Sequence, residues 1–167
     1  MVLMEEARRL ARLLDGQALP DMEVFTAQAV RVPLRVHLAG RAVVYFVPGE
    51  NQDVPQHRGF VDHFDDFREI GVKVLCVSSQ HRRDMRPVLR DLLIRHLLVS
   101  DPTLRIGRAL GLPSEQRRRD RRYRRVTLVT HHGRVLRVFF PLLRDDAAEN
   151  ARNVLDWLAK PVSDASE

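Results

Sequence analysis

Residues 42–47, Ala-Val-Val-Tyr-Phe-Val, form the most strongly strand-like run of the chain. Apolar, mostly β-branched and aromatic side chains follow one another without a polar break, which is typical of a strand buried on both faces. Pro48 and the glycine after it end the run, and residues 49–57 are polar and predict a loop. Residues 59–70 carry phenylalanines at helical spacing, and residues 72–78 form a second buried strand. Strands that alternate with helices predict a layered α/β domain.

The second half of the chain continues this alternation. An amphipathic helix is expected at residues 84–95, and an arginine-rich loop at residues 113–122. Two strands are expected at 126–130 and 135–140, and the turn residues His131, His132 and Gly133 between them predict a hairpin. A last helix is expected at 147–158. Because a hairpin contributes antiparallel strands, we expect a mixed central sheet with helices on both faces.

The composition excludes several classes of site. Of the 167 residues, 44% are hydrophobic and 30% charged, which suits a globular domain with a core. The net charge is +6, and Lys73 and Lys160 are the only lysines, so arginine supplies the excess. Cys76 is the only cysteine. One cysteine excludes an internal disulfide, a CxxC pair and a cysteine-based zinc site.

The ends of the chain predict a simple organisation. Leu3, Ala7, Leu10 and Leu14 recur at helical spacing, so residues 1–15 are expected to form an amphipathic helix. Residues 16–160 form the domain, and residues 161–167 are expected to be a flexible tail. The chain shows neither the basic-then-apolar order of a signal peptide nor an apolar run of about 20 residues. We therefore expect a cytoplasmic protein that does not cross a membrane.

Several short stretches, taken in order, resemble one family. They are GQALPD (16–21), VVYFVP (43–48), GFVDHFDDFREIGVKVLCVSS (59–79), SDP (100–102), LRIGRALGL (104–112) and RVTLVTHHGRV (125–135). Over roughly residues 16–159 the chain resembles the peroxiredoxins of the AhpC/TSA type, most closely their bacterioferritin-comigratory or Q-type branch. The resemblance implies a thioredoxin-like fold and, for an intact member, thiol peroxidase activity that needs no cofactor.

The resemblance also implies a thiolate nucleophile, in a T-P-G-C-like run at the start of the helix after the first strand. The segment there contains no cysteine. Counting forward from Pro48 puts the expected nucleophile at Pro55, and counting back from Phe60 puts it at Asp53. The second cysteine often found in the Q-type branch would fall near Arg58. The resemblance therefore predicts a scaffold that has lost its nucleophile.

Two supporting positions of the family match this sequence. Pro48 matches the proline that shapes the pocket, and Arg124 matches the arginine that flanks the thiolate, while Thr130 replaces an expected aspartate. We interpret Pro48, Asp53, Pro55 and Arg124 as a remnant binding pocket. The interpretation is a protein without thiol peroxidase activity, retained as a redox-related binding or regulatory module. A homodimer, a small anion or a protein partner would suit that role.

Cys76 carries the first alternative, a divergent antioxidant thiol oxidoreductase. It lies inside the strand at 72–78, where cysteine usually behaves as a small inert hydrophobe. This position counts against the alternative unless the thiol is reachable near the strand end.

An arginine cluster at 117–125 carries the second alternative, an anion or nucleic-acid binder. The residues expected to bind the anion are Arg117, Arg118, Arg119, Arg121 and Arg122. Arg124 and Arg125 complete the cluster. Such density gives a strong positive potential that attracts phosphates. Tyr123 is the only aromatic residue in the cluster, which argues against nucleic acid and favours a small anion. The seven histidines show no ligand spacing, so no metal site is expected.

Overall fold

The computed structural model describes residues 1–160, and the predicted tail at 161–167 lies outside the described residues. The helices are α1 (Val2–Leu14), α2 (Leu34–His37), the 3₁₀ turn η1 (Asn51–Asp53), α3 (Val54–Asp62), α4 (Phe64–Glu69), α5 (Arg82–Asp91), α6 (Arg105–Leu110) and α7 (Arg144–Ala159). The strands are β1 (Glu23–Thr26), β2 (Arg31–Pro33), β3 (Arg41–Val47), β4 (Val72–Ser78), β5 (Leu97–Ser100), β6 (Ser114–Arg117), β7 (Asp120–Tyr123), β8 (Val126–His131) and β9 (Arg134–Phe139).

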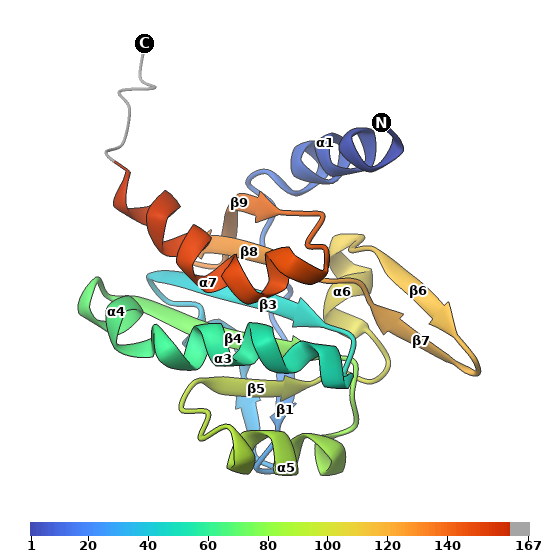
Figure 1. Cartoon of the computed structure of the whole chain (residues 1–167), viewed down its shortest axis with the longest axis vertical. Helices are drawn as coiled ribbons and strands as arrows, with labels where there is room; N and C mark the ends of the chain where they lie inside the picture. The colour runs from blue at the N-terminus through green and yellow to red at the C-terminus, as the bar shows by residue number, and fades with distance from the viewer. Residues whose placement is uncertain (161–167) are drawn as a thin grey trace.

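Seven strands form one central sheet in the order β2-β1-β5-β4-β3-β8-β9 (Figure 1). The β3, β4 and β5 strands run parallel, whereas β1, β2, β8 and β9 pair with their neighbours in antiparallel fashion. The expected mixed sheet and α/β class are therefore confirmed. The expected hairpin is also present as β8 and β9, with His132 and Gly133 in its turn at positive φ.

The strand β3 separates two hydrophobic cores, because successive side chains of a strand point to opposite faces. One core contains Val43, Tyr45, Val47, Phe60 of α3, Phe67 of α4, Met85 of α5, and Ala151 and Val154 of α7. The other contains Ala42, Val44, Phe46, Leu10 and Leu14 of α1, and Ile106 and Leu110 of α6. Helices thus cover both faces of the sheet, as expected, with α3 and α7 in contact on one of them (Figure 1).

The expected helix at 59–70 is corrected by the structure. It begins earlier, at Val54, because Pro55 occupies the first turn, where a proline costs no hydrogen bond. Pro55 thus belongs to a helix and not to the polar loop expected at 49–57. The helix also divides at His63, whose φ of −101° and ψ of 9° interrupt the helical path between α3 and α4. Residue 53 therefore lies directly at the start of α3.

The expected loop at 113–122 is also wrong, since this segment forms the hairpin β6–β7. Its turn contains Arg118 at a φ of +53°. Tertiary contacts hold the hairpin, because Tyr123 at its end is buried against Phe46 with ring centroids 5.2 Å apart. In the view of Figure 1, the β6–β7 hairpin projects from one side of the body.

Candidate functional site

The site that the resemblance implies lies between the end of β3 and the start of α3. Asp53, the last residue of η1, is 4% exposed. Its Oδ2 accepts hydrogen bonds from the backbone N–H groups of Gly49 and Glu50, both at 2.9 Å. These bonds close the turn after β3 around the carboxylate. Asp53 is thus a buried group that holds the local backbone.

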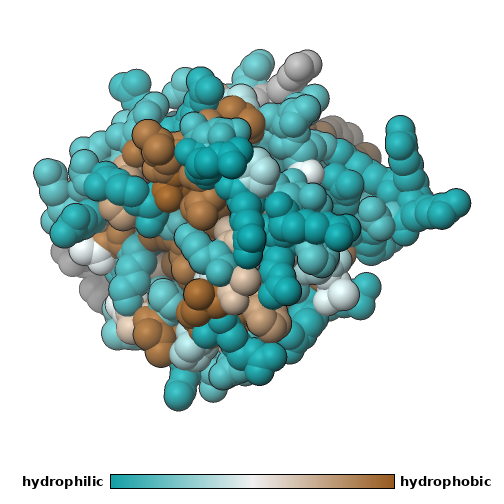
Figure 2. All heavy atoms as spheres, turned by 90° about the horizontal axis from the view of Figure 1, so that it is seen from below, coloured by the Kyte–Doolittle hydropathy of each residue, from teal (hydrophilic) through white to brown (hydrophobic). Residues whose placement is uncertain are grey.

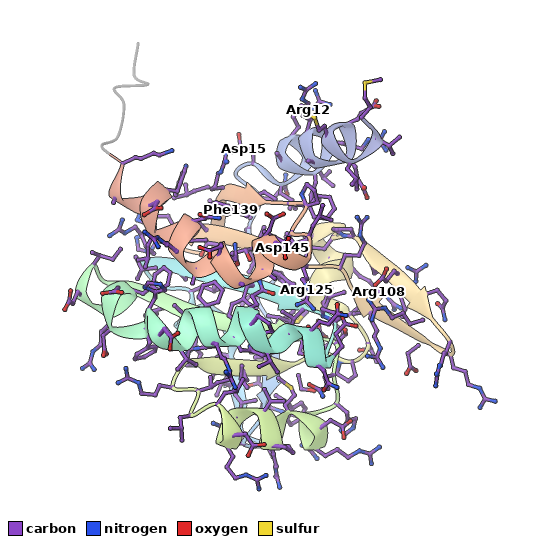
Figure 3. All side chains as sticks on the ribbon, in the orientation of Figure 1. Arg12, Asp15, Arg108, Arg125, Phe139 and Asp145 are labelled. Carbon is purple, nitrogen blue, oxygen red and sulfur yellow. The ribbon has the colours of Figure 1, made fainter. Side chains whose placement is uncertain are left out.

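Arg125 supplies the charge partner of Asp53. Its Nη2 lies 2.7 Å from Asp53 Oδ1, which is an ion-pair distance. Arg125 also lies 3.1 Å from Glu50 Oε1 and donates to Gln56 Oε1 at 3.1 Å. Figure 3 labels Arg125 close to the beginning of α3. Burial raises the pKa of the Asp53 carboxyl, while Arg125 and the two backbone amides act in the opposite direction and limit the rise.

Counting along the loop gave residues 53 and 55 as the two candidate positions of the lost nucleophile. The structure places these two residues in different surroundings. Asp53 is buried and faces Arg125, whereas Pro55 is exposed in the first turn of α3. Pro48 ends β3, and its carbonyl accepts a 2.7 Å hydrogen bond from Ser79 Oγ. It also lines a cavity of about 250 Å³ that Arg124 and Arg125 share. Of these two residues, Asp53 is therefore the one that forms an ion pair with an arginine, although Pro55 also lines a cavity with Arg125.

Arg124 does not contact Asp53. Its Nη1 lies 2.6 Å from Glu6 Oε1 of α1, and its guanidinium lies over the ring of Phe140, 4.9 Å from the centroid. Neighbouring residues of an extended segment point to opposite sides, so only one of two adjacent arginines can face α3. Arg125 is that residue, and Arg124 instead ties the N-terminal helix to the body.

Cys76 lies within the sheet, next to Tyr45 in the parallel register of β3 and β4. It is fully buried. Burial raises the pKa of its thiol well above the usual value, and the nearby Asp53 raises it further. The thiol is consequently protonated at neutral pH, the form that is not nucleophilic.

Sequence reasoning missed a buried polar cluster beneath Asp53. The Tyr45 hydroxyl lies 2.8 Å from His57 Nδ1 and 2.6 Å from His96 Nε2. A phenol carries one proton, so it donates to one ring and accepts from the other. Burial lowers the pKa of His57 to about 4, with Arg125 contributing, and lowers that of His96 to about 3, with His57 contributing. A tyrosine inside an apolar strand was the available signal, because a buried hydroxyl needs a partner.

The arginines predicted to bind anions are divided among three surroundings. Arg117 forms ion pairs with Glu50 and Glu115, so its charge is already compensated. Arg118 lies in the exposed turn of the β6–β7 hairpin. Arg119, Arg121 and Arg122 line a second cavity on the other side of Gly49. The cluster is therefore not one surface.

The described part of the chain shows two further properties. No group of three or more histidine, cysteine, aspartate or glutamate side chains within residues 1–160 is placed to hold a metal ion. None of the helices in this range is long and apolar enough to cross a membrane.

Solved structures share this fold. A peroxidoxin, BcpB from Mycobacterium tuberculosis, is 20% identical, with a TM-score of 0.74 over 87% of this chain and 98% of that one. Reduced Prx3 from Vibrio vulnificus is 22% identical, with a TM-score of 0.76 over 87% and 98%. A cysteine-to-serine mutant of PrxQ from Xylella fastidiosa is 17% identical, with a TM-score of 0.74 over 86% and 94%. These likenesses confirm the thioredoxin-like peroxiredoxin fold.

No curated protein sequence matches the chain. The model of the AhpC/TSA family, by contrast, matches residues 16–152. This range contains β3, the Asp53 turn, α3 and Arg125, so it spans the whole candidate site. The chain belongs to the AhpC/TSA family.

Proposed function

We propose that this protein keeps the peroxiredoxin scaffold without thiol peroxidase activity and serves as a redox-related binding or regulatory module. One observation carries the proposal. The residue at the start of α3 that faces an arginine is Asp53, a buried carboxylate already paired with Arg125. A carboxylate cannot take the place of a thiolate that is oxidised by a peroxide, because it has no sulfur to carry the oxidation.

Peroxide consumption by the purified protein tests the loss of activity. We expect hydrogen peroxide and an organic hydroperoxide to be consumed no faster with the protein and a thiol reductant than with the thiol reductant alone. We expect the Cys76→Ser variant to behave identically, because Cys76 is fully buried. Turnover in the wild type that disappears in Cys76→Ser would refute the proposal and establish the alternative of a divergent thiol oxidoreductase.

A thiol introduced at residue 53 tests the position of the lost nucleophile. In Asp53→Cys the new thiol would lie beside Arg125 and the N–H groups of Gly49 and Glu50, which favour a thiolate. A free thiol is only a few per cent ionised at pH 7, so each unit by which the pKa falls raises the thiolate fraction about tenfold. Burial opposes ionisation at this position, as it does for the Asp53 carboxyl, so the thiolate depends on the Arg125 guanidinium. We expect Asp53→Cys to react with hydrogen peroxide about tenfold faster at pH 7 than Asp53→Cys/Arg125→Gln, which lacks that guanidinium.

Pro55→Cys provides the matched comparison, because the two counts of the loop differ between residues 53 and 55. Residue 55 lines a cavity of about 260 Å³ together with Arg125, but it is exposed, so water screens it from the guanidinium. It also lacks the N–H groups of Gly49 and Glu50, which bond to Asp53. We therefore expect its thiol to react at the rate of a free thiol. Equal reactivity of the two variants, measured by mass spectrometry of the oxidised protein, would contradict the assignment of the nucleophile position to Asp53.

The predictions of a homodimer, of a protein partner and of a cytoplasmic location stay predictions. Sedimentation of the purified protein over a range of concentrations measures the first directly. A species of constant monomeric mass would contradict it.

A further inference from the structure

A large polar cavity lies outside the Asp53 site. It measures about 790 Å³ and is formed where the start of α5, α6 with the segment before it, and the β6–β7 hairpin meet. Five arginines from these segments line it: Arg83, Arg108, Arg119, Arg121 and Arg122. Figure 3 labels Arg108 beside the hairpin, and Figure 2 shows hydrophilic side chains over the projecting end of the molecule. Two of the five arginines, Arg83 and Arg108, come from outside the sequence cluster.

These five arginines differ from their neighbours in their charge balance. Arg117, Arg124 and Arg125 each have a glutamate or aspartate within 4 Å. Among the residues that the structure describes, no carboxylate lies within ion-pair distance of any of the five. Arg121 donates to Ser114 Oγ at 2.8 Å and Arg122 to the carbonyl of Gly49 at 3.1 Å, both neutral acceptors. The arginines of the cavity therefore keep most of their donors free.

The wall of the cavity also contains two carboxylates, Asp84 and Asp120. Five guanidinium groups outnumber them, so the cavity keeps an excess of positive charge. Like charges that converge on a concave surface repel one another, and an anion bound between them removes that repulsion. The charge distribution thus favours a ligand with several negative charges.

Buried contacts hold the two sides of the cavity together. The Tyr123 hydroxyl donates to Asp101 Oδ2 at 2.6 Å and accepts from the Gly107 N–H at 2.8 Å. A Cβ at residue 107 would lie 2.3 Å from the Tyr123 ring, so the glycine is required for this approach. Because Tyr123 ends β7 and Gly107 lies in α6, the contact fixes Arg108 relative to the arginines of the hairpin. The backbone segments that carry these arginines are therefore already in place when a ligand binds, and only the exposed side chains have to become ordered.

We propose that this cavity binds a small molecule that carries a chain of two or three phosphate groups. Guanidinium groups bind phosphate oxygens in pairs, and several such groups match several phosphates. Among the described residues that line the cavity there is no Phe, Tyr or Trp, and His81 is the only aromatic ring on which a base could stack. That composition favours a compact oligophosphate over a nucleic-acid strand. This proposal names the class of ligand for the binding role proposed above. It rests on that earlier proposal only in taking the protein to act by binding a ligand.

Calorimetric titration of the full chain with inorganic triphosphate, at about 0.15 M ionic strength, tests the proposal. We expect saturable binding, with orthophosphate binding more weakly. Arg83→Gln/Arg108→Gln is expected to weaken binding by at least about tenfold, because each guanidinium–phosphate contact is charge-assisted. Arg119→Gln, in the exposed hairpin, provides a second variant should the first fail to fold.

The control is Arg58→Gln/Arg152→Gln, which removes the same charge from two exposed helical arginines outside the cavity. We expect it to change the affinity by less than about twofold, which separates the cavity from the net charge. Equal weakening by both double variants, or no binding by the wild type, would overturn the proposal. Binding of a single-stranded oligonucleotide that triphosphate does not displace would overturn it in favour of nucleic acid. Peroxide turnover is measured separately, so either proposal can fail without the other.

Discussion

Replacing Arg125 by glutamine is expected to lower the free energy of unfolding by about 3–5 kcal/mol, the typical cost of removing one partner of a buried ion pair. The Arg125 side chain is 10% exposed and that of Asp53 is 5% exposed, so water screens the pair little. Without the guanidinium, the Asp53 carboxylate would remain buried with only the N–H groups of Gly49 and Glu50 as partners. Urea denaturation at pH 7, followed by circular dichroism, measures the loss.

Arg124→Gln is the matched control, because Arg124 is adjacent in sequence but pairs with Glu6 at a more exposed position. Side-chain exposures of 29% and 37% place that ion pair in a class that contributes at most about 1 kcal/mol. Asp53→Asn/Arg125→Gln should recover part of the stability lost in Arg125→Gln, since no buried charge is then left unpaired. A loss of less than 1 kcal/mol in Arg125→Gln would show that the two groups do not act as a buried pair.

Acid is expected to destabilise the protein once the pH falls below about 6.5, the usual pKa of histidine in an unfolded chain. Burial lowers the pKa of His57 to about 4 and of His96 to about 3, whereas the unfolded chain protonates histidine near 6.5. Between these values the unfolded state binds more protons than the native state, so stability falls as the pH falls. The stabilisation is complete above pH 6.5, and His57 alone accounts for roughly 3 kcal/mol of loss by pH 4. The free energy of unfolding, measured from pH 7.5 to pH 4.5, should show this slope.

His57→Gln separates the histidines from other acid effects. Its side-chain amide can still bond to the Tyr45 hydroxyl but does not titrate, so the slope between pH 6.5 and pH 5 should fall by about half. Asp53 acts in the opposite direction, because burial raises the pKa of its carboxyl in the native state. A slope unchanged in His57→Gln would show that the native state does not exclude the proton from His57.

Local patterns in the sequence were sufficient for most of the fold. The apolar runs at 42–47 and 72–78 predicted two buried strands, and β3 and β4 confirm them. Burial on both faces leaves a signature in consecutive residues, which is why these strands are visible without any partner. The β6–β7 hairpin left no such signature, because its stability comes from Tyr123 packing into a distant core.

The sequence by itself determined that this family member has one cysteine, which lies in a strand, and none in the segment between the strand at 42–47 and the helix that follows it. Tertiary structure decided which residues face one another: Arg125 rather than Arg124 beside Asp53, and Tyr45 between His57 and His96. It also decided which arginines are compensated by carboxylates and which converge on a cavity. The physical reason is that apolar periodicity is a property of neighbours in the chain. Ion pairs and buried hydrogen bonds instead join side chains that lie tens of residues apart, at distances that only the packed sheet and helices fix.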